Sequence, residues 1–124
     1  MTFASESLAA ALEAQDAVAV AFALRNDRVA VPLLGGDDAQ VRVFRRGDAD
    51  KYMLLLFSSL DAYQLMVPEE PDLQVAAYDA ETLRDFLAQN IGVLEAVWFD
   101  VAGPHAMQAT PQDVLDALEL QAEA

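Results

Sequence analysis

The sequence predicts a single α/β domain with α+β character, built on a mixed parallel and antiparallel sheet of about five to six strands covered by helices. Three observations predict it. The 124 residues are a common size for one domain, and a hydrophobic fraction of 55% suffices for one core. Between residues 51 and 100, strand and helix patterns alternate, which is typical of parallel strands joined by crossovers. Before residue 51, strand patterns are separated by short turns, which favour antiparallel pairing.

Two helices are expected first, over residues 5–14 and 16–26. Ser5 is a suitable N-cap for the first, and the glutamate that follows it suits the helix dipole. The second segment, DAVAVAFALRN, alternates as a strand would. Its alanine content and a cap at Asp16 nevertheless favour a helix that ends near Asn26.

Two strands are expected next. Residues 28–34 form the first, and Pro32 indicates that it lies at an edge or ends there. The glycines and aspartates of residues 35–38 predict a turn. The segment AQVRVFRR, residues 39–46, alternates strictly and predicts a half-exposed strand.

The continuous apolar run KYMLLLF, residues 51–57, predicts an interior strand buried on both faces. We expect it to run parallel to residues 73–77. Ser58 is expected to cap a helix over residues 59–66, with Asp61 in the place of the glutamate of a capping box.

The remaining elements follow the same rules. A strand over residues 73–78 leads to a helix over residues 80–90 capped by Asp79, and then to a strand over residues 94–100. A last helix begins after Thr110, where a cap is followed by proline and an acidic first turn.

The stretch DVAGPHAM predicts a chain reversal between two antiparallel strands, the second over residues 105–109. Gly103 is expected to supply torsional freedom and Pro104 to fix the turn. Asp100 is expected to accept backbone N–H bonds within the turn. His105, the only histidine, is interpreted as a structural residue beside the turn.

Composition excludes several kinds of function. The chain has no cysteine, so disulfides and thiolate chemistry are ruled out. Its net charge of −14 repels phosphate backbones and argues against a nucleic-acid partner. No apolar run is long enough for a membrane span, and the start of the chain lacks the pattern of a secretory signal. We therefore expect a cytoplasmic protein with no membrane association and no cofactor.

No motif for catalysis or metal binding emerges. The glycines at residues 35 and 36 lack the spacing of a phosphate loop. Asp48 and Asp50 open like a calcium loop, but the later ligands are missing. Ser58 and Ser59 lie where a nucleophile elbow would, without its flanking glycines. A hydrolase is thus the disfavoured alternative, and we expect no catalytic and no metal site.

Two groups of residues remain as candidate sites. The carboxyl ends of parallel strands are where open sheets of this kind bind ligands. The candidate ligand pocket there comprises Ser58, Ser59, Tyr78, Asp79 and Asp100.

Six of the seven basic residues lie between residues 25 and 51. The candidate interaction patch comprises Arg42, Arg45 and Arg46. The alternative is that these arginines are ordinary charges on edge strands, where charge discourages aggregation.

Three stretches carry a resemblance to a known family. They are LRNDRVAVPLL, YMLLLFSSLDAYQ and VWFDVAGPHAMQATPQDVLDAL. In this order they resemble the SseB N-terminal domain family, also called SseB-like and named for enhanced serine sensitivity, over roughly residues 16–120. Val101 departs from the proline that is more usual there. The resemblance implies an α/β domain and brings no catalytic residue with it.

These observations favour a non-enzymatic protein-interaction or regulatory domain, whose protein partner the sequence does not identify. The alternative is a small-molecule binding domain that uses the pocket described above. The antiparallel strand edge and the apolar content favour a weak homodimer, whereas the net charge opposes one. Any such dimer is expected to be strengthened by salt, which screens the repulsion within about 10 Å at 0.1 M.

Overall fold

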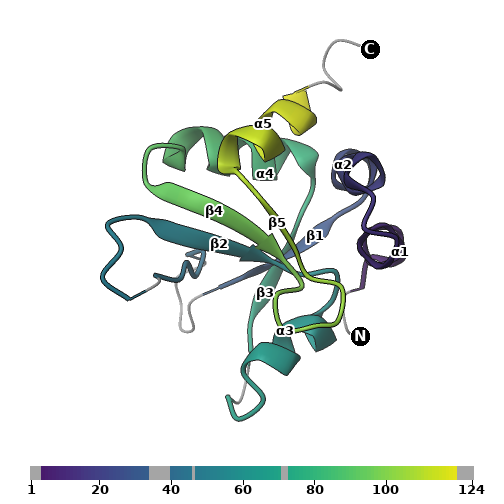
Figure 1. The fold of residues 1–124 in the computed structure, drawn as a ribbon, viewed down its shortest axis with the longest axis horizontal. Helices are drawn as coiled ribbons and strands as arrows, with labels where there is room; N and C mark the ends of the chain where they lie inside the picture. The colour runs from purple at the N-terminus through teal and green to yellow at the C-terminus, as the bar shows by residue number, and fades with distance from the viewer. Residues whose placement is uncertain (1–3, 34–39, 46, 71–72, 120–124) are drawn as a thin grey trace.

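The computed structural model describes residues 4–33, 40–45, 47–70 and 73–119. It is an α+β fold in which helices surround strands that cross the centre of the molecule (Figure 1). The described helices are α1 (Glu6–Glu13), α2 (Ala17–Asn26), α3 (Leu60–Met66), α4 (Ala80–Asn90) and α5 (Pro111–Glu119). The described strands are β1 (Val29–Pro32), β2 (Tyr52–Leu56), β3 (Val75–Tyr78), β4 (Leu94–Phe99) and β5 (Met107–Ala109).

The strands form two sheets, one of order β2-β4-β5 and one of order β1-β3. β2 and β4 are parallel, whereas β4–β5 and β1–β3 are antiparallel. An isolated antiparallel bridge from Ala30 to Phe57 joins the two sheets. Beyond the end of β2, the chain therefore lies between β1 and β4.

The predicted parallel pairing of residues 53–57 with 73–77 is wrong, because β1 lies between these segments. Ala30 pairs with Ala77 in β3 on one side and with Phe57 on the other. All four residues of β1 are buried, so this strand occupies an interior position that the sequence pattern did not assign to it. The parallel partner of β2 is β4.

The apolar run at the centre of the chain is buried on both faces, as its continuous pattern predicts, and it contributes to two cores. Its predicted interior position is wrong, because β2 is an edge strand of the sheet β2-β4-β5, and only the isolated bridges of Phe57 to Ala30 and of Met53 to Phe44 lie on its other side. Leu54 and Leu56 belong to the larger core, which includes buried residues of α1, α2, α4 and α5. Leu55 and Phe57 belong to a smaller core with Tyr63 of α3. The phenol ring of Tyr63 is completely buried and lies against the Phe57 ring, with centroids 5.1 Å apart.

No strand forms over the described residues 40–45, which corrects the prediction of a strand over residues 39–46. This segment makes only two isolated bridges, Val41 with Leu33 and Phe44 with Met53. It passes from the end of β1 to the start of β2, and so it follows neither strand for long. The turn predicted at residues 35–38 lies outside the described residues.

The predicted helix caps are confirmed at four positions and shifted at a fifth. Ser5, Asp16, Asp79 and Thr110 each accept a backbone N–H of the first turn that follows. The cap of α3 is Ser59, which accepts from Ala62 N–H, and not Ser58. Ser58 is committed elsewhere, because its N–H and its hydroxyl both donate to Asp100.

The chain reversal between β4 and β5 is confirmed as antiparallel, but its unusual torsion falls on a different residue. Asp100 has φ 47°, whereas Gly103 has no positive φ and a Cβ there would meet only ordinary contacts. The Asp100 carboxylate accepts from Ser58 and not from the turn, contrary to the prediction. Within the turn, the backbone oxygen of Asp100 accepts from Gly103 N–H.

None of the helices in the described parts of the chain has the length and apolar character that a membrane span requires.

Candidate functional site

The ends of the two parallel strands are joined by a polar clip formed by Ser58 and Asp100. One carboxylate oxygen accepts from Ser58 N–H at 2.7 Å and the other accepts from Ser58 Oγ at 2.7 Å. Ser58 is 5% exposed, and its carbonyl accepts from Ser5 N–H. A buried serine whose hydroxyl already donates to a carboxylate is not presented to a substrate. We interpret this pair as a structural clip between β2 and β4.

The other residues of the candidate ligand pocket also have partners within the fold. Ser59 caps α3, and Asp79 caps α4 by accepting from Thr82 N–H. This backbone hydrogen bond is the main cause that lowers the pKa of Asp79. The half-buried Tyr78 packs against the larger core. Asp79 lies at the same end of the sheet as Ser58, because β3 and the end of β2 both run antiparallel to β1.

The three arginines of the candidate interaction patch differ in their surroundings. Arg42 donates to Tyr63 Oη at 2.8 Å and to both carboxylate oxygens of Glu70, at 2.7 and 3.2 Å. The hydrogen bond with Glu70 is the main cause that raises the pKa of Arg42, and it lowers the pKa of Glu70. Arg45 is exposed, and Arg46 lies outside the described residues. Arg42 therefore anchors its segment to α3 through the buried tyrosine.

A groove that the sequence did not predict runs between α1 and α2. Its volume is about 480 Å³, and Ala10, Ala14, Ala19 and Ala23 are among the residues that line it. Figure 1 shows the two helices side by side and end on. Two apolar side chains of α2 border the groove and are largely exposed, Val18 at 77% and Phe22 at 60%.

A signal for this groove was present in the sequence. The helix AVAVAFALRN buries one stripe, Val20, Ala23 and Leu24, yet it is apolar on its other faces as well. Val18 and Phe22 are one turn apart and therefore share a face of the helix outside that stripe. A helix that is apolar all round is expected to be buried on all sides. In α2, this expectation fails on the side that faces the groove.

The turn between the two helices is held by its own hydrogen bonds. Asp16 N–H donates to Ala11 O and Gln15 N–H donates to Leu12 O, the pattern of a Schellman motif. Gln15 takes the positive φ, 52°, that glycine usually adopts there. Its side chain donates to Leu12 O and to the carbonyl of His105, an exposed residue of the β4–β5 turn.

The helices α1 and α2 form a helical hairpin, and the end of this hairpin opposite the turn is held by a carboxylate. One oxygen of Asp27, the C-cap of α2, accepts from the hydroxyls of Ser5 and Ser7 at 2.8 Å each. The hydrogen bond from Ser5 is the main cause that lowers the pKa of Asp27. Both ends of the α1–α2 hairpin are thus held in place, and the groove between them is a fixed feature of the surface.

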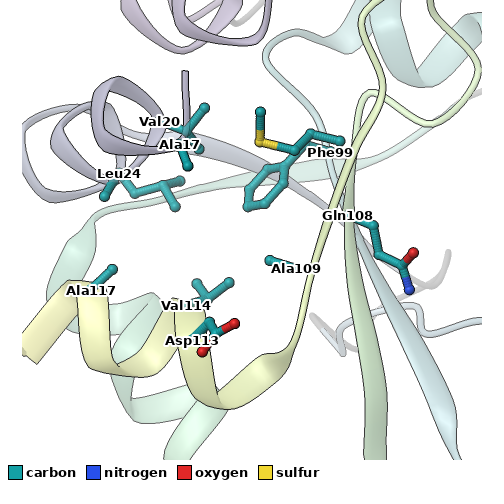
Figure 2. Close-up of a pocket in the computed structure, with 11 residues that line it drawn as sticks. Ala17, Val20, Leu24, Phe99, Gln108, Ala109, Asp113, Val114 and Ala117 are labelled. Carbon is teal, nitrogen blue, oxygen red and sulfur yellow. The ribbon is translucent and has the colours of Figure 1, made fainter. Parts of the chain in front are cut away.

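A second hollow lies on the other side of α2, between this helix, β5 and α5. Its volume is about 230 Å³, and its lining is mostly apolar. Figure 2 shows the Phe99 ring projecting into the space between α2 and α5, while Gln108 points to the opposite side of β5. Asp113 of α5 is the acidic residue that lines this hollow.

Within the described ranges, no three histidine or acidic side chains lie close enough together to hold a metal ion. Neither hollow has a lining suited to a phosphate-bearing cofactor, since the charged side chains that line them are the carboxylates of Asp16 and Asp113. What the two hollows do offer is apolar surface with an acidic border.

Comparison with known proteins places this sequence in a family. No curated protein matches the chain. The family model described as the SseB protein N-terminal domain matches residues 5–116, which extends the expected resemblance to include α1. The matched region contains both helices of the hairpin, the five strands of the described residues and most of α5. The chain therefore belongs to the SseB protein N-terminal domain family.

Proposed function

We propose that this domain is a non-enzymatic protein-interaction module that docks a partner protein on the α1–α2 groove. The observation that carries the proposal is the exposure of Phe22 and Val18 at the border of an apolar groove. A single exposed apolar side chain is ordinary on a protein surface. Here two of them lie one turn apart beside a furrow of small residues, which is the arrangement of an aromatic anchor with space next to it.

The rest of the molecule supports an interaction role over catalysis. Ser58 and Asp100 are of the residue types that a hydrolase would use, but they are hydrogen-bonded to each other. Asp79 and Ser59 are engaged in capping helices. Around the groove, in contrast, the side chains of Val18 and Phe22 contribute little to the packing of the domain itself.

Cross-linking in the native host tests this proposal. A photo-reactive amino acid at position 22 should give a discrete cross-linked species, and the same residue at position 65 should not. Leu65 is the matched control, because it is also 60% exposed and lies on α3. The partner identified in this way, once purified, should lose affinity for the Phe22→Ser variant and keep it for Leu65→Ser. Equal effects of the two variants would refute the proposal.

A second candidate function is the binding of a small molecule in the hollow between α2, β5 and α5. The observation that favours it is the mostly apolar lining of this partly open hollow, to which the buried Phe99 contributes (Figure 2). At about 230 Å³ the hollow is smaller than the pockets of drug-sized ligands, so it suits a compact apolar molecule. A fragment screen followed by amide shifts should locate binders at α2 and α5. The Ala117→Phe variant, which fills the hollow, should abolish those shifts.

A further inference from the structure

The α1–α2 groove has the form and charge of a site for one kind of partner segment. We propose that its occupant is an amphipathic helix of another protein, about three turns long, with an apolar face flanked by lysine or arginine. This inference rests on the interaction function proposed above and adds the chemistry of the partner. Three features of the hairpin lead to it: the lining, the length and the charge of its border.

The lining favours a helix over an extended segment. The backbone groups within α1 and α2 are used in their own helices, so an added strand would find no main-chain partners there. A helix satisfies its own backbone and needs only side-chain contacts. The alanines at positions 10, 14, 19 and 23 keep the furrow free of large side chains. A groove lined by small side chains allows the side-chain ridge of a third helix to approach closely.

The length of the hairpin sets the length of the partner. α1 has 8 residues and α2 has 10. At about 1.5 Å per residue, the furrow between them is roughly 12–15 Å long. A helix of about three turns covers this distance and presents anchors at positions i, i+3 or i+4, and i+7. Phe22 and Val18, one turn apart, are placed to pack between such anchors.

The acidic residues beside the groove belong to α1 and to the turn that follows this helix. Glu6, Ala10 and Glu13 follow each other at spacings of four and three residues, so the two exposed glutamates flank a residue of the lining. Asp16 lines one end of the groove. The basic side chain of α2 is directed elsewhere, because Arg25 donates to the carbonyl of Ala117 on α5. Cations on the partner therefore complement this border.

The same charges disfavour a second copy of this chain as the occupant. A symmetric contact would place Glu6, Glu13 and Asp16 of one copy against the same patch of the other. Each copy also carries a net charge of −14. The two occupants differ in the sign of their salt dependence, since salt weakens attraction between opposite charges and relieves repulsion between like charges.

The test uses the purified full chain and a synthetic helical peptide of about 12 residues, with leucines at the anchor positions and lysines on both flanks. Controls are a scrambled peptide of the same composition and one with glutamate in place of lysine. We expect binding of the lysine peptide only, with amide shifts confined to α1 and α2. Its affinity should fall as salt rises from about 50 to 300 mM.

Matched variants separate specific docking from general attraction to an acidic protein. Phe22→Ser should weaken binding by about tenfold or more, and Leu65→Ser should not. Glu13→Lys should weaken it by several-fold, whereas Asp85→Lys, an equal change of charge on α4, should have no such effect. Equal losses for Glu13→Lys and Asp85→Lys, or equal binding of the scrambled peptide, would overturn the inference.

Two further outcomes keep this inference distinct from the interaction function itself. If cross-linking at position 22 identifies a partner that docks on the groove without a basic helix, the function stands and the inference fails. If sedimentation shows self-association that strengthens with salt and is abolished by Phe22→Ser, the occupant is a second copy and the inference also fails.

Discussion

The strand ends at Ser58 and Asp100 and the groove between α1 and α2 differ in what their side chains have left to offer. At the strand ends, polar groups are abundant, but each serves the fold as a cap or as part of the clip. In the groove, polar groups are few, and the apolar side chains of Val18 and Phe22 remain largely exposed. The proposed docking surface therefore depends on side chains that have no internal role, and not on chemically versatile residue types.

The largest effect expected at the candidate sites is the loss of the clip. Asp100→Ala removes the acceptor of two hydrogen bonds and places alanine at φ 47°, so it should lower the free energy of unfolding by about 3 kcal/mol. Asp100→Asn should cost less, because asparagine tolerates this torsion and keeps one acceptor oxygen. Urea unfolding measures both. An Asp100→Ala protein of normal stability would show that the carboxylate is not there for the fold.

The next effect distinguishes two adjacent serines. Ser59→Ala removes the cap of α3 and should cost about 1 kcal/mol, with faster hydrogen exchange at the Ala62 amide. Ser58→Ala should leave that amide unchanged, because Ser58 donates to Asp100 instead. Hydrogen exchange followed by NMR separates the two. Faster exchange at Ala62 in the Ser58→Ala protein would restore the assignment of the cap to Ser58.

Most of the helices and strands could be predicted from the sequence, whereas the order of the strands could be predicted only in part. Caps such as Asp16 and Asp79 act within one turn, so the local sequence contains the whole interaction. The position of β1 between β2 and β3 depends on how tertiary packing buries Ala30, a residue with no distinctive pattern. The cap of α3 is Ser59 and not the predicted Ser58 for the same reason. Ser58 donates instead to Asp100, which lies 42 residues away in the sequence.

The candidate sites show the same limit. Ser58 and Asp100 were predicted to lie together, and they do, because both follow parallel strands. Their engagement with each other occurs together with a positive φ at Asp100, which the sequence does not reveal. Arg42 was predicted as a surface charge, but the buried Tyr63 below it provides an internal partner. The groove escaped prediction because apolar side chains are assumed to be buried until packing is known.

A smaller effect is expected when low pH protonates Asp27, which holds together the start of α1 and the end of α2. The hydrogen bond from Ser5 lowers the pKa of Asp27 below its ordinary value of about 4. The ionised carboxylate therefore adds stability that is fully present above about pH 4 and is lost as the pH falls through the lowered pKa. Asp27→Asn should abolish this part of the acid sensitivity. Unfolding midpoints between about pH 5 and pH 2 that decline equally in both proteins would contradict it.

The smallest expected effect is the most informative about the groove. Because Phe22 is 60% exposed, Phe22→Ser should change the free energy of unfolding by no more than about 0.5 kcal/mol. Leu24, two residues along the same helix, is 4% exposed, and Leu24→Ala should cost about 2–5 kcal/mol. Thermal and urea unfolding of the two variants gives the contrast directly. If Phe22→Ser destabilises the domain as Leu24→Ala does, the phenyl ring is needed by the fold and the docking surface loses its anchor. If the fold is indifferent to Phe22, the side chain has no task within the domain, and this result supports the proposal that it anchors a partner.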